Sequence, residues 1–340
     1  MESKPVPPMT QEAILALARR FTESRIVLTA ARLDVFTPLA GAALTAAEVA
    51  DRVKATARGI AALLDALAAM GLLEKAEGKY RCPAQVAASL SADSPTSILP
   101  MLLHSDGMWQ RWSGLTEIVR RGAGAMAGAP VTGDDARRQE AFIGAMHAIG
   151  RRAAGPLVAA IGPGAAARLL DVGGASGTYT QAFLEASPTL RATLFDLPPV
   201  IEMARRRLGE TGLLDRITLV AGDFYRDELP AGHDLALLSA IIHQNGPEQN
   251  VALFGKIRRA LEPGGRLVIR DHVMGPDHTR PRSGALFAVN MLVGTTGGGT
   301  YAFEEIRDGL AAAGFERIRL VREDDDRMTG LVEGFTPKAI

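Results

Sequence analysis

The chain has 340 residues, a length typical of two domains of ordinary size. Its 38 basic and 38 acidic residues cancel, so the overall charge excludes the strongly basic character of many nucleic-acid and membrane-surface proteins. The single cysteine, Cys82, excludes an internal disulfide and indicates a reducing compartment. Charged residues, Gly and Pro interrupt every apolar run before it reaches membrane-spanning length, so we expect a cytoplasmic protein without a membrane partner.

The first hundred residues have the pattern of helices with one small hairpin. Apolar residues over 11–31 recur with helical periodicity. The sequence Thr45-Ala46-Ala47-Glu48 has the form of a capping box that opens a short helix, and a second helix is expected to stop at Gly71. Two short runs then flank a turn at Glu77-Gly78. This order predicts a mainly α-helical, winged-helix-like domain over residues 1–103.

Residues 104–161 are again mainly helical, with a loop predicted over 122–135, and are expected to link this domain to the remainder. Beyond Arg168, helical patterns separate most of five apolar runs, ARLLDV, ATLFDL, ITLVAGD, LALLSAI and RLVIRDH. Such alternation predicts an α/β fold with a doubly wound, mostly parallel, Rossmann-like sheet covered on both faces. We therefore expect a catalytic domain over 104–340, and the acidic run 323–326 to be a solvated turn.

Glycines and acids follow three consecutive strand patterns. The first strand opens into a loop that begins at Asp171 and contains Gly173 and Gly177; the second ends at Asp196 and the third at Asp223. The loop has the spacing D-x-G-x-(G/A)-x-G rather than G-x-G-x-x-G, which suits a ligand without a pyrophosphate. The carboxylate of Asp196 can accept hydrogen bonds from both hydroxyls of a ribose, and that of Asp223 from an adenine amino group. Each acid alone is commonly a cap or turn residue, but three such ends in order predict a nucleoside cofactor.

With these motifs in place, the stretch LLDVGGASGTYTQAFLEASP…ATLFDLPPV…RITLVAGDFY…ALLSAIIHQNGPEQN…LEPGGRLVIRDHVM resembles the plant caffeate-type and bacterial secondary-metabolite O-methyltransferases. The likeness covers nearly the whole chain, including the N-terminal region, which is a dimerisation domain in that family. It implies a homodimer and S-adenosylmethionine as cofactor, with S-adenosylhomocysteine as product. The family's glycine at position 175 is alanine here, which the backbone tolerates if φ is not positive there. The expected cofactor-binding residues are Asp171, Gly173, Gly177, Asp196, Leu197, Asp223, Phe224 and Ser239.

The fourth strand leads to His243, and the fifth ends at Asp271. A neutral imidazole within hydrogen-bond reach can deprotonate a phenol. In the resembled family a histidine at this place is the general base and an acid orients it, which implies these roles for His243 and Asp271. Two departures concern this centre: His-Gln-Asn (243–245) replaces the family's His-Asp-Trp, and Thr300 takes the place of a second flanking acid. A histidine that merely hydrogen-bonds at a strand end remains the alternative.

For the acceptor, the resemblance implies that Met146 and Met291 hold an aromatic ring between their thioethers, although their spacing fits ordinary core as well. Asn290, Phe142 and Trp109 are further candidates for this pocket. The predicted reaction is O-methylation of a hydroxylated aromatic or polyketide-like small molecule.

No metal is expected, because the spacing of Asp271, His272 and His278 is not that of a ligand set. Other activities remain open: methyl transfer to nitrogen or carbon by proximity alone, or a homologue that uses the cofactor for another chemistry. A winged-helix DNA-binding regulator is disfavoured, since the helix expected over 58–70 carries Arg58 as its only basic residue. This composition suits a helix packed on a partner chain, and no nucleic-acid partner is expected.

Overall fold

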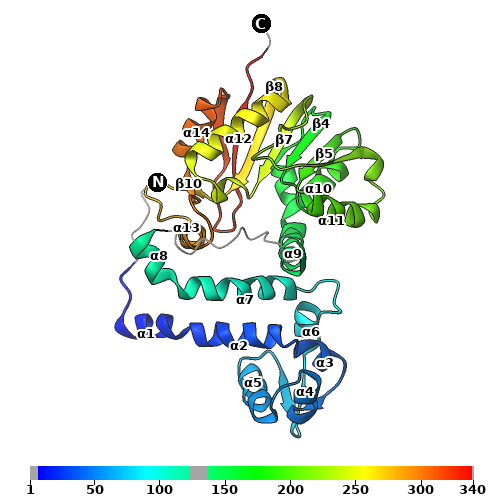
Figure 1. Ribbon diagram of the computed structural model, residues 1–340, viewed down its shortest axis with the longest axis vertical. Helices are drawn as coiled ribbons and strands as arrows, with labels where there is room; N and C mark the ends of the chain where they lie inside the picture. Colours follow the sequence, from blue (N-terminus) through cyan, green and yellow to red (C-terminus); the bar gives the residue numbers. More distant parts are fainter. Residues whose placement is uncertain (1–6, 123–135, 339–340) are drawn as a thin grey trace. The chain divides into compact units, whose positions relative to one another are not determined.

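The computed structural model describes residues 7–122 and 136–338. The chain divides into two compact units, Met1–Trp109 and Gln110–Ile340, which are traced from blue to red in Figure 1. Nearly all of the loop predicted over 122–135 lies outside the described residues.

The first unit is a set of short helices around a small sheet. Its elements are α1 (Gln11–Arg19), α2 (Phe21–Arg32), α3 (Phe36–Gly41), β1 (Leu44–Thr45), α4 (Ala46–Arg52), α5 (Ala57–Ala69), β2 (Glu74–Ala76), β3 (Lys79–Arg81), α6 (Ala84–Leu90) and most of α7 (Leu99–Ser113). The strands lie in the order β1-β3-β2, and all neighbours are antiparallel. The helix expected over 11–31 is two helices, which meet at Arg20.

Local sequence features set the boundaries of these elements. The Thr45 hydroxyl accepts from the amide of Glu48, and the Glu48 carboxylate accepts from the amide of Thr45 at 2.7 Å, so the predicted capping box is confirmed. Gly71 follows α5 with a φ of +76°, as expected for a residue that ends a helix. Glu77 and Gly78 both have positive φ and join β2 to β3, so the predicted hairpin turn is confirmed as well.

The second unit contains a central sheet and its covering helices. Its elements are the end of α7, then α8 (Leu115–Arg121), α9 (Ala136–Ile161), β4 (Arg168–Val172), α10 (Thr178–Ala186), β5 (Arg191–Asp196), α11 (Pro198–Gly209), η2 (Leu214–Arg216), β6 (Ile217–Ala221), β7 (His233–Ser239), η3 (Ile242–Gln244), α12 (Pro247–Ala260), β8 (Leu261–Asp271), β9 (Val273–Met274), α13 (Arg282–Gly294), β10 (Tyr301–Ala302), α14 (Phe303–Ala312), β11 (Glu316–Arg322) and β12 (Gly330–Phe335).

The sheet order is β11-β12-β8-β7-β4-β5-β6, with β4 to β8 parallel and β12 antiparallel to both of its neighbours. All five predicted strands are present, and the mostly parallel, doubly wound class is confirmed. The strands β11 and β12 were not predicted. Strand order reverses beside β4, which has β5 on one side and β7 on the other. Ligands of open α/β sheets bind at such a point, outside the carboxyl ends of the strands.

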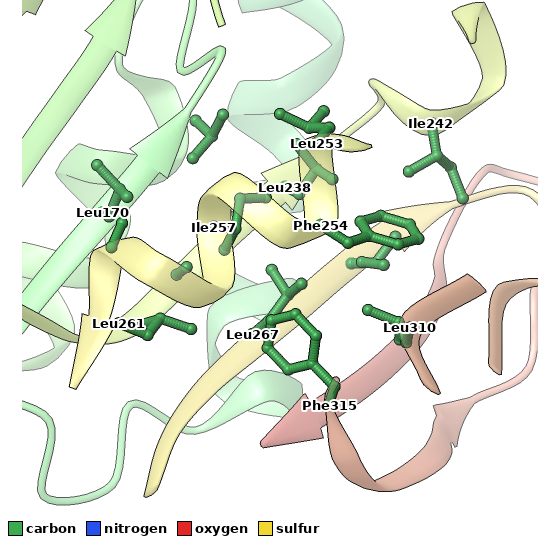
Figure 2. Packing of buried hydrophobic residues seen from close by; sticks show 14 of the residues in the cluster. Leu170, Leu238, Ile242, Leu253, Phe254, Ile257, Leu261, Leu267, Leu310 and Phe315 are labelled. Carbon is green, nitrogen blue, oxygen red and sulfur yellow. The ribbon is translucent and has the colours of Figure 1, made fainter. Parts of the chain in front are cut away.

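Apolar side chains cover both faces of the sheet, which explains why its strands are nearly continuous apolar runs. On one face, Phe254 and Ile257 of α12 pack with Leu310 of α14 and with Phe315 (Figure 2). On the other face, a second cluster joins α9 and α10 to the sheet, among them Leu157 and Phe183. With both faces covered, the carboxyl edge of the strands is the part of the sheet that remains for chemistry.

Candidate active site

The loop after β4 has glycine where nothing larger fits. Gly173 has a φ of +69°, and a Cβ there would lie 2.8 Å from Cδ1 of Ile241 and 3.5 Å from the ring of Phe224. Gly177, with a φ of +74°, would press a Cβ against Leu208 at 2.7 Å. The loop therefore requires glycine at both positions, because the backbone is left-handed and neighbouring side chains take the space of a Cβ.

Ala175 has a φ of +49°. Alanine was expected to be tolerated here only if φ is not positive, so the residue is strained. A left-handed conformation costs an L-residue with a Cβ roughly 1–2 kcal/mol. The chain accepts this strain in a loop whose shape Asp196 fixes: the Ala175 amide donates to Oδ2 of Asp196 at 2.8 Å.

We expect Ala175→Gly to leave the free energy of unfolding unchanged or to raise it by up to about 1 kcal/mol, because relief of strain offsets the larger entropy of the unfolded chain. Urea unfolding measures this. The matched control is Ala252→Gly at an exposed position within α12, which should lower the free energy by about 1 kcal/mol. Equal losses at the two positions would contradict the strain at Ala175.

Asp196 ends β5 beside this loop. Its Oδ1 accepts from the amide of Leu197 at 2.7 Å and its Oδ2 from that of Ala175 at 2.8 Å. A carboxylate has about four acceptor positions, so these two bonds fix its orientation and leave capacity for two further donors. A ribose supplies two adjacent hydroxyls, which matches this capacity. Leu197 takes part through its backbone amide, which no side-chain pattern would indicate.

Asp223 and Phe224 follow β6, the next strand outward. The Gly222 amide donates to the carbonyl of Asp196 at 2.9 Å, which brings the two strand ends together. The Asp223 carboxylate accepts from the amide of Tyr225 at 2.9 Å, and its side chain is 31% exposed, so it can accept another donor. Phe224 packs on the core and faces Gly173, where it can contact one face of an aromatic ring. The predicted strand ends therefore lie together at one edge.

Asp171 and Ser239 complete the predicted set at this edge, but they differ in exposure. Asp171 is buried and accepts from the hydroxyl of Thr180 at 2.6 Å, and burial raises its pKa to about 6 against the opposing effect of that bond. These contacts tie Asp171 to the first turn of α10, and its contact with a cofactor stays a prediction. Ser239 ends β7, one residue beyond Leu238, the register partner of Val172 at the end of β4, and is partly exposed.

Burial also raises the pKa of Asp196 to about 6, although the amides of Leu197 and Ala175 act in the opposite direction. Only the ionised carboxylate accepts from both hydroxyls, so we expect the Kd of the cofactor to rise roughly tenfold between pH 7 and pH 5, as protonation competes with binding. Calorimetric titration across this range measures the change. Asp196→Asn cannot titrate, so a Kd with the same pH dependence in this variant would assign the effect to another group.

His243 lies just beyond the end of β7, in the short helix η3. Its Nδ1 is 2.9 Å from Oδ1 and 3.0 Å from Oδ2 of Asp271, which ends the adjacent strand β8. The two side chains are 12% and 1% exposed, so the pair is largely shielded from water. Because a carboxylate can only accept, Nδ1 carries the proton and Nε2 is left as the basic nitrogen. This is the arrangement that a general base requires.

Asn245, at the place of the family's tryptophan, belongs to a buried hydrogen-bond network. Asn245 is fully buried; it donates to Oδ1 of Asn250 at 3.0 Å and accepts from the hydroxyl of Tyr225 at 2.5 Å. Asn250 in turn donates to the carbonyl of Ile242 at 3.0 Å. A hydrogen-bonded network therefore holds the turn that carries the base.

Thr300 is buried, and its hydroxyl has no hydrogen-bond partner among the described residues. The preceding residue, Gly299, donates to the carbonyl of His243 at 2.9 Å. The segment that carries Thr300 in place of a second acid therefore lies against the turn that carries His243. In this turn Asp271 is the acid bonded to the imidazole.

Helix α13 carries two of the predicted acceptor residues. Met291 is buried, and Asn290 accepts from the indole of Trp112 at 3.0 Å. Phe287, one turn before Met291, lies edge-on to His243 with ring centroids 4.8 Å apart. Sequence reasoning missed Phe287 and Trp112, although helical spacing from Met291 would have indicated the first.

The remaining acceptor candidates lie in different parts of the chain. Met146 is partly buried in α9, and the side chain of Phe142 lies outside the described part of that helix. Trp109 belongs to the first unit, where the guanidinium of Arg25 lies 5.4 Å from its ring. The prediction that these residues line one pocket stays a prediction.

The two histidines considered for a metal site have other partners. His272 contacts Asp324 at 2.6 Å through Nδ1, and His278 lies 3.3 Å from Glu305. The prediction of a solvated turn over 323–326 is wrong for Asp324, whose side chain is fully buried against His272. The described residues contain no group of three or more His, Cys, Asp or Glu that could hold a metal ion.

Comparisons with known proteins identify the family of this chain. Residues 112–316 match the family model of an O-methyltransferase domain, and residues 15–92 that of an O-methyltransferase dimerisation domain. A 3-hydroxy-5-methyl-1-naphthoate 3-O-methyltransferase from Streptomyces sahachiroi is 32% identical over 94% of this chain and 93% of its own. The tetracenomycin polyketide synthesis 8-O-methyl transferase TcmO of Streptomyces glaucescens is 32% identical over 90% and 91%.

A solved structure, PigF with SAH, is 27% identical, superposes with a TM-score of 0.84, and covers 96% of this chain and 100% of its own.

No helix in the described parts of the chain is both long enough and apolar enough to span a membrane.

Proposed function

The chain belongs to the S-adenosylmethionine-dependent O-methyltransferases, and from this membership we propose that it methylates a hydroxyl of a fused-ring aromatic molecule with His243 as general base. The observation that carries the proposal is the His243–Asp271 pair, which lies at the same sheet edge as the acids Asp196 and Asp223.

The residues present fit the cofactor. Gly173 carries no side chain and lies beside Phe224, Asp196 has capacity for two further donors, and the Asp223 side chain is partly exposed. We assign the ribose to Asp196, the adenine amino group to Asp223 and the adenine ring to Phe224. When bound, S-adenosylmethionine supplies an electrophilic methyl group on its sulfonium.

His243 and Asp271 act on the proton of the acceptor hydroxyl. Nε2 of His243 accepts this proton as the oxygen attacks, because Nδ1 is held protonated by the carboxylate. Asp271 keeps the ring in that orientation and stabilises the imidazolium that forms, as in other His–acid pairs. Phe287, edge-on to the ring, limits access of water to the base.

The acceptor class rests on the relatives and on α13. Both Streptomyces relatives are named for hydroxylated aromatic or polyketide substrates. In this chain the buried Met291 and the ring of Phe287 lie on the helix next to the base, and a flat apolar ring packs well on a thioether and an aromatic edge.

A product screen tests this assignment. We would incubate the protein and S-adenosylmethionine with 2-naphthol, 2-naphthylamine and methyl naphthalenes, and identify the products by mass and NMR. O-methyl products from the naphthol are expected. Methylation of the amine alone would contradict the proposed acceptor and the need for a base.

We also propose that the first unit joins two copies of this chain. It matches the family's dimerisation domain, and its helix α1 buries no side chain, so Ile14, Leu15 and Leu17 are each 45% or more exposed. A sedimentation mass of twice 35.9 kDa is expected. Ile14→Glu with Leu17→Glu should lower the mass to one chain, and a wild type that sediments as a single chain would contradict the proposal.

A further inference from the structure

Arg270 is a buried arginine at the carboxyl edge of the sheet. It is the penultimate residue of β8 and is 7% exposed. Its Nη1 lies 3.5 Å from the hydroxyl oxygen of Ser239, and its Cζ is 5.5 Å from the ring centroid of Tyr179 in α10. The guanidinium thus lies between the end of β7 and the first turn of α10.

No carboxylate among the described residues pairs with this guanidinium, and its Nε is buried without a hydrogen-bond partner. The ring of Tyr179 compensates part of the charge, but a buried cation normally requires an anion and acceptors for its N–H groups. Arg266, on the same strand and face, shows the usual solution: its Nε also has no partner, but it contacts Glu333 at 2.5 Å and donates to the carbonyls of Ile161 and Gly162. Arg270 lacks such a set.

The position of Arg270 indicates which kind of molecule supplies its missing anion. Ser239 is its register partner on β7 and directly follows Leu238, which pairs with Val172, the residue before Gly173. Arg270 therefore belongs to the row of strand ends that holds the glycine loop, and on the neighbouring residue of β8 the carboxylate of Asp271 holds the base. An anion for Arg270 is therefore expected from a ligand that binds at these strand ends.

We propose that Arg270 is the carboxylate-binding residue of this active site, an inference that rests on the proposed methyl transfer from S-adenosylmethionine. The planar guanidinium matches the two oxygens of a carboxylate, and a shielded position strengthens such a pair. Two ligands can supply the group: the methionine part of the cofactor and an aromatic acid used as acceptor. Both give Arg270 its counter-ion at the strand ends.

Calorimetric titration with two probes tests the first source. S-adenosylhomocysteine carries the carboxylate, and its decarboxylated analogue does not. If the cofactor supplies the group, Arg270→Met should weaken S-adenosylhomocysteine about 10- to 100-fold and the analogue by less than about threefold, and Arg270→Lys should lie between.

Steady-state kinetics test the second source with acceptors that share one ring system. If the acceptor supplies the group, Arg270→Met should leave the affinity for S-adenosylhomocysteine unchanged and raise KM for 3-hydroxy-1-naphthoate, but not for 2-naphthol, by about 10- to 100-fold. Either pattern supports the carboxylate site and names its source.

Arg266→Met is the matched control, since it removes an arginine from the same strand and face. It leaves the buried carboxylate of Glu333 with one partner fewer, so the melting temperature should fall while both probes and both acceptors keep their constants. Arg270→Met should not lower the melting temperature, because it removes an uncompensated buried charge.

Two further results would contradict the Arg270 site alone or the proposed function as a whole, and they can be told apart. If wild type binds S-adenosylhomocysteine and Arg270→Met keeps every affinity and KM, or loses them equally with and without the carboxylate, the Arg270 site is overturned alone. If wild type binds neither probe and methylates neither acceptor, the proposed function is overturned and the site with it.

Discussion

Replacement of His243 by alanine is expected to lower the rate of methyl transfer about 10²–10⁴-fold, the usual contribution of a general base, while the Kd of S-adenosylhomocysteine stays within about twofold. The reason is geometric: the imidazole is held by Asp271 at 2.9 Å through Nδ1 and contributes its free nitrogen to the acceptor. Single-turnover rates with 2-naphthol measure the loss.

The acidity of the acceptor provides a second measurement on this variant. A nitro-substituted naphthol, already ionised at neutral pH, needs no base, so His243→Ala should recover most of its rate with that acceptor. The control is His278→Ala, which removes an imidazole that is 46% exposed and paired with Glu305. If His243→Ala slows both acceptors equally, the histidine positions the ring of the acceptor and is not the base.

Asp196→Ala is expected to weaken cofactor binding about 10²–10⁴-fold. Two hydrogen bonds from ribose hydroxyls to a carboxylate are lost, each worth about 1.5–3 kcal/mol. The substitution also frees the amides of Ala175 and Leu197, so the loop loses part of its shape. Asp196→Asn keeps one carbonyl oxygen and should show a smaller loss. Calorimetric titration of S-adenosylhomocysteine measures both variants.

The opposite edge of the sheet offers a matched control for this experiment. Asp234, near the start of β7, accepts from the amides of Ala167 and Arg168 at 2.9 Å each. Asp234→Ala therefore removes a carboxylate with two backbone bonds and should cost similar stability, as followed by urea unfolding, with no change in Kd. A weakened Kd in Asp234→Ala of the same size would show that loss of stability, and not loss of contacts, explains Asp196→Ala.

The strands that lead to Asp196, Asp223 and Asp271 were predictable because each is an apolar run followed by an acid, and in a parallel sheet such ends must share an edge. The left-handed Ala175 was not predictable, because the strain depends on where Asp196 holds the loop. Nor was the burial of Asp324, which lies in an acidic run that on composition alone should be solvated.

The unpredicted residues of the site share a cause. The role of Phe287 depends on its contact with His243, and that of Arg270 on its contacts with Ser239 and Tyr179. These neighbours are remote in sequence. Periodicity places a residue on a face but does not say what lies opposite. The strands β11 and β12 escaped prediction for a related reason, since β12 enters the sheet between β8 and β11 through pairing that no local pattern records.

The base and the acceptor helix are attached to the fold by different contacts. His243 is held by β8 through Asp271, and its turn is held by α12 through the amide of Asn250, whereas Phe287 and Met291 are presented by α13. Mutations in α13 away from Phe287, whose ring lies against His243, can therefore alter the acceptor side while the contacts that hold the base remain. A chain built in this way can diversify its substrate range over evolution, or in a library of α13 variants, while its chemistry stays constant.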